Sequence, residues 1–485
     1  MGTTPTGIPG SVHREDLAAP APPAALAGRE DTLRLAYAQW DRHPLVHALE
    51  FDGLNLNIAA GDEMFLHCLG QNDGWRDMAL VHYLRSAAMG ARTMGQVIRW
   101  FSHGTATGPR ILDFASGYGR TTRFLIEQVP PERIWVSDIQ ADGVAFQQRQ
   151  FGVHGLASSA DPEALAVGER FDLIFVLSLF SHLPDSSFTA WLGKLYSLLS
   201  DRGCLVFSTL GEPSLPPDKH LPPDGFLFST HSESAVLPGE QYGTLWTSES
   251  YVSARIAAAC DGARWRRIPR ALWHLQDLYV VARGEDLDLA GLVVAAGPEG
   301  YLDDIQLQAD PAMLYLRGWA LDHDDLSRPA IVEVQVGDGP LLALEPDVSR
   351  PDVGSALHLQ TAVPMGWTAS YRHPTRHILS TDVVVVRARG VSSDFILHAA
   401  PVDSTVFERR WQAAESALRA STRRVEELSQ ALGREQGEAA ALAERIAWME
   451  QSRFWKARDH WFRLKGALSL GASERAPRPP RESSL

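Results

Sequence analysis

Cysteines, long apolar runs and excess basic charge are all scarce in this 485-residue sequence. The three cysteines, Cys68, Cys204 and Cys260, are far apart and odd in number, so they predict neither a disulfide framework nor a zinc site. No apolar run reaches the ~20 residues that span a bilayer. The formal net charge of −14 disfavours a nucleic-acid partner. A reducing, cytoplasmic setting is the expectation.

The two ends of the chain are predicted to be disordered. Residues 1–35 are rich in Pro, Ala and Gly and lack a basic segment followed by an apolar core, so they indicate a leader and not a signal peptide. Residues 467–485, with several prolines, are predicted to form a disordered tail. At roughly 100–200 residues per domain, the remaining length predicts two or more folded units.

The first of these units is predicted at residues 36–290 and belongs to the α/β class. Residues 36–105 have apolar side chains at three- and four-residue spacings, which predicts a helical lid. The core, residues 106–285, alternates apolar strands with helices. This alternation predicts a doubly wound, mostly parallel sheet that is covered on both faces. The strands are expected at residues 110–114, 133–138, 171–177 and 203–209.

Residues 300–402 change to short strands separated by turns, with no helical pattern. Strands are expected at residues 312–319, 331–336 and 382–388, with the turn Gly337–Pro340 between two strands. This arrangement predicts a separate all-β sandwich domain. For Trp319 and Trp367, packing in the core is favoured over stacking on a sugar, because tryptophans in sandwiches are usually buried.

Residues 404–466 follow a third pattern. Apolar residues recur in alternating steps of four and three from Phe407 to Met449, which predicts a coiled coil and a homo-oligomer. The alternative is a single helix lying on the protein's own surface. Residues 452–468 mix aromatic and basic side chains, which suits contact with the inner face of a membrane. A capping helix is the alternative there.

A glycine turn follows the first predicted strand of the core. It reads Asp113-Phe-Ala-Ser-Gly117-Tyr-Gly119, and its glycines allow a ligand to approach the backbone. A dinucleotide fingerprint requires a third glycine, where this chain has Thr122. The carboxylate of Asp113 would repel a pyrophosphate but suits a cationic ligand. Asp138, at the end of the next strand, can accept hydrogen bonds from ribose hydroxyls. Together these residues predict S-adenosylmethionine as the cofactor.

These motifs resemble the class I S-adenosylmethionine-dependent methyltransferases. The resemblance extends to Phe171–Leu183 and to His274–Val281, and no metal-ligand spacing appears. It implies a Rossmann-like fold in which the glycine turn faces the methionine part and Asp138 the ribose. Ser159, Ala160 and Asp161 would face the adenine, and Leu177 or Ser178 would lie beside the methyl donor. The cofactor-binding residues implied are Asp113, Ala115, Gly117, Gly119, Asp138, Ile139, Ser159, Asp161, Leu177 and Ser178.

The residue expected to act as general base is His182, which follows the strand at residues 171–177, where the acceptor pocket of the family opens. The alternative role for His182 is capping or packing. Other acceptor-side candidates are His82 and Tyr83 on the predicted lid. His220, His231 and Tyr242 lie in the proline-rich insert of residues 211–246, which is expected to border the acceptor.

The segments that follow the α/β core resemble modules of bacterial cell-surface glycan enzymes. The motifs are RGWALD at 317–322, GDG at 337–339, SRPDV at 349–353 and MGW at 365–367. They imply methylation of an oxygen on a glycan or glycan precursor. The alternatives are a methyltransferase for a small secondary metabolite and a catalytically inactive scaffold. An NAD or nucleotide-sugar oxidoreductase is disfavoured by Thr122.

Overall fold

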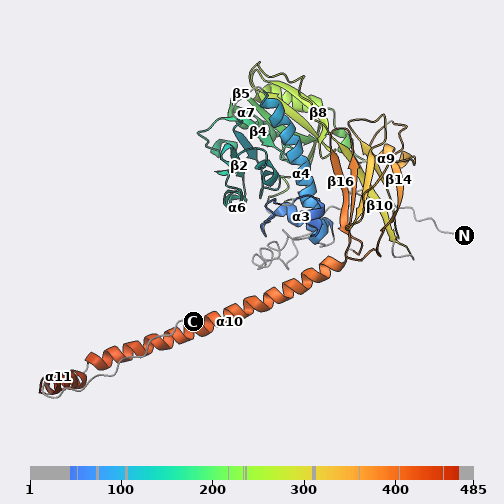
Figure 1. The fold of residues 1–485 in the computed structure, drawn as a ribbon. Coiled ribbons are helices and arrows are strands. Elements are labelled where there is room, and N and C mark those ends of the chain that lie inside the picture. Colours follow the sequence, from blue (N-terminus) through green and yellow to red (C-terminus); the bar gives the residue numbers. More distant parts are fainter. Residues whose placement is uncertain are drawn as a thin grey trace. The chain divides into compact units, whose positions relative to one another are not determined.

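The computed structural model describes most of the chain between residues 44 and 468. The described ranges are 44–51, 53–72, 76–103, 108–216, 218–232, 234, 237–308, 313–359, 361–403, 405–451 and 453–468. The chain divides into two compact units, residues 1–415 and 416–485 (Figure 1). The predicted leader lies outside the described residues. Residues 467 and 468 of the predicted tail are the end of a helix, and residues 469–485 lie outside the described residues.

The first unit contains a nine-stranded mixed sheet in the order β3-β2-β1-β4-β5-β7-β6. Its first five strands are parallel, β9 runs antiparallel to β5, and β8 pairs with β9. This arrangement confirms the Rossmann-like, mostly parallel sheet. The strands are β1 (Ile111–Phe114), β2 (Ile134–Asp138), β3 (His154–Ala157), β4 (Phe171–Val176), β5 (Leu199–Leu210), β6 (Phe226–Ser229), β7 (Thr244–Thr247), β8 (Arg264–Leu272) and β9 (Gln276–Ala282).

Helices cover both faces of this sheet. Successive strand residues point to opposite sides, so each face carries its own set of apolar side chains for the helices to bury. Leu112 and Ile174 join one apolar core with α7 and α8, whereas Ile111 and Leu173 join another with α4 and α6. The described residues of this region also form short 3-10 turns, which are η2 (Pro131–Arg133), η3 (Pro162–Ala164) and η4 (Glu212–Ser214). The helices are α2 (Pro44–Ala48), α3 (Glu63–Gln71), α4 (Arg76–Phe101), α5 (Thr122–Leu125), α6 (Ala141–Phe151), α7 (Asp185–Ser197) and α8 (Glu249–Ala259).

The predicted helical lid at residues 36–105 is less continuous than expected. Its described part holds three helices, and the chain between α2 and α3 is not helical. Phe51, Leu54 and Ile58 of this connection nevertheless pack into the same apolar core as α3 and α4. The apolar spacings that predicted helix are therefore those of α4, and the prediction extended too far toward the N-terminus. In the core, α5 is a single helical turn of four residues.

Seven strands after residue 297 form two antiparallel sheets that share one apolar core. The core combines Leu314 and Leu316 of one sheet with Val332, Val334 and Val386 of the other. Trp367, 1% exposed, lies inside it as expected. One sheet is β10 (Pro298–Leu307), β11 (Met313–Asp322) and β14 (Gly366–Arg372), and the other is β13 (Leu342–Leu344), β12 (Ile331–Val336), β15 (Val383–Arg389) and β16 (Asp394–Pro401) (Figure 1).

A short helix interrupts this β region, where the sequence showed no helical pattern. It is α9 (Pro351–Ala356), with Pro351 at a first-turn position where proline is well tolerated. Six residues are too few to produce a periodic apolar pattern. The β region also contacts α4. Arg85 of α4 donates hydrogen bonds from its guanidinium to the carbonyl oxygens of Ile396 and Leu397 in β16, at 3.0 and 2.9 Å.

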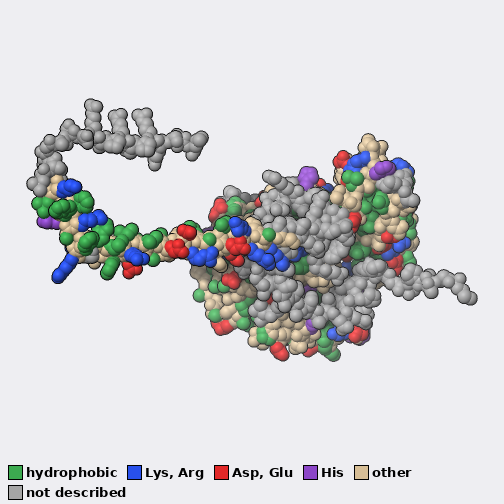
Figure 2. Space-filling view, turned by 90° about the horizontal axis from the view of Figure 1, so that it is seen from below, with side chains coloured by type: hydrophobic (Ala, Val, Ile, Leu, Met, Phe, Trp, Pro, Cys, Tyr) green, Lys and Arg blue, Asp and Glu red, His purple; other side chains and the backbone are tan. Residues whose placement is uncertain are grey.

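Two helices, α10 (Thr405–Gln451) and α11 (Arg453–Leu468), account for the described residues after residue 404. This agrees with the helices expected there, whereas the pairing of α10 with another helix stays a prediction. Figure 2 shows hydrophobic side chains at the surface of these helices, between charged ones. They include Val425, Leu428, Leu432, Leu442 and Ile446, each more than half exposed. Among the described residues, no helix combines the length and apolarity required to cross a membrane.

Candidate active site

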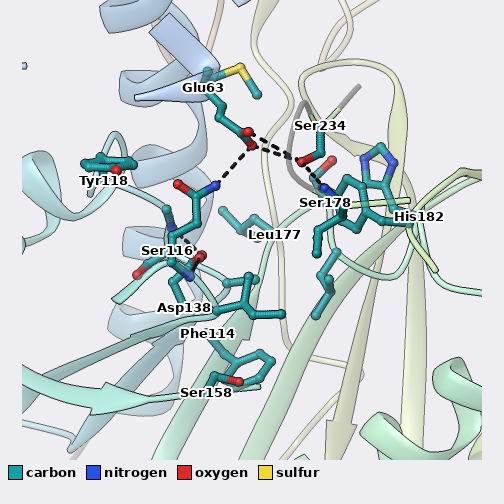
Figure 3. A pocket seen from close by; sticks show the side chains of 18 of the residues that line it. Glu63, Phe114, Ser116, Tyr118, Asp138, Ser158, Leu177, Ser178, His182 and Ser234 are labelled. Carbon is teal, nitrogen blue, oxygen red and sulfur yellow. Dashed lines mark hydrogen bonds between the residues drawn. The ribbon is translucent and has the colours of Figure 1, made fainter. Parts of the chain in front are cut away.

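A cavity of about 510 Å³ opens at the carboxyl ends of β1, β2 and β4 (Figure 3). The sheet order reverses between β1 and β4, and ligands of open α/β sheets bind at such a point. The volume falls within the range of about 300–1,000 Å³ usual for small-molecule pockets. Of the predicted site residues, the lining includes Asp113, Ala115, Gly117, Asp138, Ile139, Ser159, Leu177, Ser178 and His182.

The glycine turn after β1 forms one wall of the cavity. Ala115, Gly117 and Gly119 have φ angles of 59°, 57° and 77°, a region that favours glycine and strains alanine. At Gly119 a Cβ atom would also lie 2.6 Å from the Phe151 ring and 2.7 Å from Oε1 of Gln147. Gly119 does not line the cavity. Its contribution is steric, because its missing side chain allows α6 to pack against the turn.

Asp138 is held by the backbone of two loops. Its Oδ2 accepts a hydrogen bond from the Gly117 amide and its Oδ1 one from the Gln140 amide, both at 2.8 Å. Burial raises the pKa of this carboxyl group, and the amide bonds counteract part of that rise. A carboxylate offers about four acceptor positions, so Asp138 keeps acceptor capacity for a ligand. The orientation of Asp138 is therefore set before a nucleoside arrives.

Asp113 lies behind the turn and is buried. Its Oδ2 accepts a hydrogen bond from the Thr122 hydroxyl at 2.9 Å. Burial raises the pKa of Asp113 to about 7, although the Thr122 hydrogen bond acts in the opposite direction. The residue that replaces the third glycine of a dinucleotide fingerprint thus anchors the acid. A cationic ligand beside Asp113 would favour its ionised form.

The end of β4 is fixed by a network of polar side chains. Ser178, with a φ of 69°, accepts a hydrogen bond on Oγ from Gln276 Nε2 at 2.9 Å. Its amide donates to Ser208 Oγ at 2.8 Å, and that hydroxyl donates to Gln276 Oε1 at 2.6 Å. β5 and β9 therefore hold the position where a reacting methyl group is expected. The Ser208 and Gln276 partners could not be predicted from local sequence.

His182 is 6% exposed and lies on the opposite wall from the glycine turn (Figure 3). Its Nδ1 lies 2.7 Å from the Gly243 carbonyl oxygen, which can only accept, so Nδ1 carries the proton. Nε2 is then the basic nitrogen of the neutral ring. The ring stacks on Tyr242, with centroids 4.5 Å apart and an interplanar angle of 16°. His182 thus combines packing, the alternative role considered for it, with a place in the cavity wall.

Several other candidates lie away from the cavity lining. Asp161 accepts a hydrogen bond from the Glu163 amide at the start of η3. His82 Nδ1 lies 3.1 Å from Asn72 Nδ2, and the Tyr83 hydroxyl donates to Asp62 Oδ2 at 2.6 Å. The two histidines of the insert, His220 and His231, are also absent from the lining, whereas Tyr242 lines the cavity.

Sequence analysis did not single out several cavity residues from outside the glycine turn, among them Glu63, Gln140 and Trp273. Glu63 of α3 accepts hydrogen bonds from Gln140 Nε2 at 3.0 Å and from the Ser234 hydroxyl at 3.2 Å (Figure 3). The insert thereby meets α3 at the cavity. Trp273, between β8 and β9, has a φ of 54° and donates from its indole nitrogen to the Ser86 carbonyl oxygen at 2.8 Å. No local pattern distinguishes these residues.

Comparison with known proteins identifies the central part of this region. Residues 111–203 match the family described as "Methyltransferase domain". A malonyl-[acyl-carrier protein] O-methyltransferase from Calditerrivibrio nitroreducens is 26% identical over 132 residues, covering 27% of this chain and 51% of the relative. One from a Paenibacillus species is 30% identical over 138 residues, with coverages of 27% and 49%. The chain thus spans about half the length of these relatives.

This chain is also similar to solved structures of methyltransferases. A 1,6-didemethyltoxoflavin-N1-methyltransferase from Burkholderia thailandensis, solved with S-adenosylhomocysteine, is 17% identical. The match covers 47% of this chain and 93% of the other, with a TM-score of 0.30. The family match and the two curated relatives carry the conclusion: the chain contains a class I S-adenosylmethionine-dependent methyltransferase domain.

Proposed function

We propose that the chain transfers a methyl group from S-adenosylmethionine to an oxygen atom of an acceptor bound beside His182. The observation that carries this proposal is the shared cavity of Asp138, the glycine turn and His182. Asp138 supplies acceptors for the ribose, and Nε2 of His182 supplies a base on the far wall. Both curated relatives are named O-methyltransferases, which also favours an oxygen acceptor.

The cofactor orientation follows from the walls of the cavity. The methionine part would lie along the turn at Ala115 and Gly117, and the adenine against Ser158 and Ser159, which follow β3. The methyl group would then point past Leu177 toward His182. Acidic side chains in the lining favour a cationic sulfonium over a neutral ligand. They are Asp62, Glu63, Asp113 and Asp138.

Methyl transfer is an in-line displacement in which positioning supplies much of the rate. The acceptor oxygen forms a bond to the methyl carbon while the carbon–sulfur bond breaks. The electron pair of the broken bond stays on sulfur. The acceptor proton moves to Nε2 of His182. Donation from Nδ1 to the Gly243 carbonyl oxygen keeps Nε2 as the proton acceptor in the neutral ring.

The acceptor we propose is a glycan or glycan precursor. Trp191, Tyr242 and Trp273 supply aromatic faces in the lining, and Glu63 and Gln241 supply hydrogen-bonding groups. Ring faces beside polar groups suit a polyol ring, since its C–H face stacks and its hydroxyls need partners. The printed names of the curated relatives favour a second candidate, an acyl-carrier-bound or other small acceptor.

An acceptor screen with isotopically labelled S-adenosylmethionine tests the proposed function. We expect label to enter free sugars, lipid-linked glycans or polysaccharide fractions, and mass spectrometry of glycans from cells with and without the protein to differ by methyl groups. Labelling of acyl-carrier thioesters or small metabolites alone would replace the glycan proposal. Binding of S-adenosylmethionine with no labelled acceptor would support the inactive scaffold instead.

We also propose that α10 pairs with a second copy of the chain in a cytoplasmic homo-oligomer, with α11 at the inner membrane face. The exposed apolar stripe that includes Leu428 and Leu432 supports the pairing. The exposed Trp461 and Phe462 beside Arg463 and Lys465 support the membrane contact.

Light scattering tests the pairing. Leu432→Asp, which charges the stripe, should lower the molar mass to that of one 53.3 kDa chain. Gln430→Asp, two residues away and outside the stripe, should leave the mass unchanged. Truncation after Pro401 should have the same effect as Leu432→Asp. A truncated protein that still has the mass of two or more truncated chains would refute assembly through α10.

A further inference from the structure

Three side chains from separate segments meet where the β region adjoins the methyltransferase region. His274 lies in the turn between β8 and β9, Glu299 in β10, and His323 directly after β11. One nitrogen of each imidazole and one carboxylate oxygen all lie within 4.8 Å of one another. The sequence separations hide this cluster, which explains why metal-ligand spacing was not seen in the sequence.

Hydrogen bonds show which atoms face the centre of the cluster. His274 Nε2 lies 3.0 Å from the Ala296 carbonyl oxygen, so Nε2 carries a proton and donates it. In the neutral ring, Nδ1 then presents a lone pair toward Glu299 Oε2, 3.8 Å away. His323 Nε2 lies 2.6 Å from the same oxygen. A backbone carbonyl that accepts from the second ring nitrogen is the usual support of a metal-binding histidine.

The geometry is close to that of a small divalent cation site. Bonds of about 2.0–2.2 Å in a tetrahedral arrangement place ligand atoms roughly 3.4 Å apart. The 2.6 Å contact of His323 would have to open slightly and the 3.8 Å contact of His274 to close slightly. The His274 side chain is 5% exposed and that of Glu299 24%, so one side remains open for water as a further ligand.

The charges around the cluster leave room for a cation. Arg92 donates to the Ala296 carbonyl oxygen, and its charge is offset by Asp322, Asp324 and Asp394. Arg270 lies near Glu299, but its Nε donates to the His274 carbonyl oxygen and its Nη1 to that of Leu357. Arg92 also donates to the Ser393 hydroxyl, so the hydrogen bonds of both guanidinium groups go to acceptors outside the three clustered side chains.

We propose that His274, Glu299 and His323 bind one divalent metal ion, with Zn²⁺ as the ion to test first because two imidazoles and one carboxylate are a known zinc ligand set. The ion takes the place of the proton between His323 Nε2 and Glu299, which is released to solvent. No electron is transferred. The site ties the turn that carries Trp273, a wall of the cavity, to β10 and β11.

A bound metal ion would account for the positive φ angles in this turn. Trp273 and His274 have φ angles of 54° and 55°, which side-chain-bearing residues adopt only when their surroundings impose them. An ion that fixes the His274 side chain supplies such a constraint. The inference concerns the fixed position of Trp273 and does not depend on the identity of the acceptor.

Zinc titration of the full-length, untagged and chelator-treated chain tests the site. We expect one Zn²⁺ per chain, a higher melting temperature with Zn²⁺, and visible absorption bands when Co²⁺ is used instead. Glu299→Gln, which keeps the size of the side chain, and His323→Ala should each weaken Zn²⁺ binding by about 100-fold or more. His377→Ala, which removes an exposed histidine of the same region, is the matched control and should bind as the unaltered chain does.

Two results would overturn the proposal. One is the absence of stoichiometric Zn²⁺ binding by the unaltered chain, which would leave the cluster as a hydrogen-bonded His–Glu–His group. The other is equal Zn²⁺ affinity in Glu299→Gln and the unaltered chain, which would place the ion elsewhere. If His323→Ala melts early without metal, Glu299→Gln carries the comparison, because its amide oxygen still accepts from His323.

Discussion

Replacing Asp138 with alanine is expected to weaken S-adenosylmethionine binding by about 100-fold or more. Hydrogen bonds to a charged group contribute about 1.5–3 kcal/mol each, and the proposal gives the Asp138 carboxylate two ribose hydroxyls. At about 1.4 kcal/mol per tenfold change, their loss reaches or exceeds that factor. Alanine also removes the acceptor of the Gly117 amide and loosens the turn that faces the methionine part. Calorimetric titration measures the effect directly.

Asp161→Ala is the matched control for this experiment. Asp161 lies on the neighbouring loop and was implied by the same resemblance, but the structure places it outside the cavity lining, at the start of η3. We expect its affinity for the cofactor to change less than threefold. Equal affinities of Asp138→Ala and the unaltered chain would contradict the proposed cofactor orientation. Binding of NAD in place of S-adenosylmethionine would contradict the cofactor itself.

Replacing His182 with asparagine is expected to lower kcat by about 100-fold or more and to leave cofactor affinity nearly unchanged. A positioned general base contributes about 10²–10⁴-fold in rate. Asparagine can still donate to the Gly243 carbonyl oxygen, which His182 Nδ1 contacts at 2.7 Å, so the insert stays anchored. It has no basic nitrogen to take the acceptor proton. Steady-state kinetics with the acceptor found in the screen, together with cofactor calorimetry, separates the two effects.

His220→Ala serves as the comparison for His182. His220 belongs to the same proline-rich insert and does not line the cavity, so its replacement should change kcat less than threefold. Partial recovery of the His182→Ala variant by added imidazole would support a role in proton transfer. A His182→Asn enzyme with kcat within threefold of the unaltered chain would show that the ring only packs on Tyr242.

The part of the site built from consecutive residues could be predicted from the sequence. Asp113, Gly117 and Asp138 lie at the ends of neighbouring parallel strands, and parallel strands carry their carboxyl ends to one edge. Their meeting therefore follows from the strand pattern alone. The parallel order of β1, β2 and β4 was predictable for the same reason.

The rest of the site depends on contacts between distant segments. Glu63 meets Ser234 across 171 residues, and Gln276 holds Ser178 across 98. Neither contact produces a periodic or local pattern in the sequence. Gly119 was expected to let a ligand approach the backbone, but its steric role depends on Phe151 of α6, which only the packed structure reveals. Short elements such as α9 escaped prediction because six residues do not make a period.

The hydrogen bond between Thr122 and Asp113 carries a consequence for the evolution of this cavity. A glycine at position 122 would restore the dinucleotide pattern, but it would leave the Asp113 carboxyl group buried without its hydroxyl partner. Removing Asp113 first would in turn leave the Thr122 hydroxyl without an acceptor. Each single step toward a dinucleotide cofactor is therefore disadvantageous by itself. The two positions are therefore expected to be energetically coupled, so that replacing both costs less stability than the sum of the two single replacements.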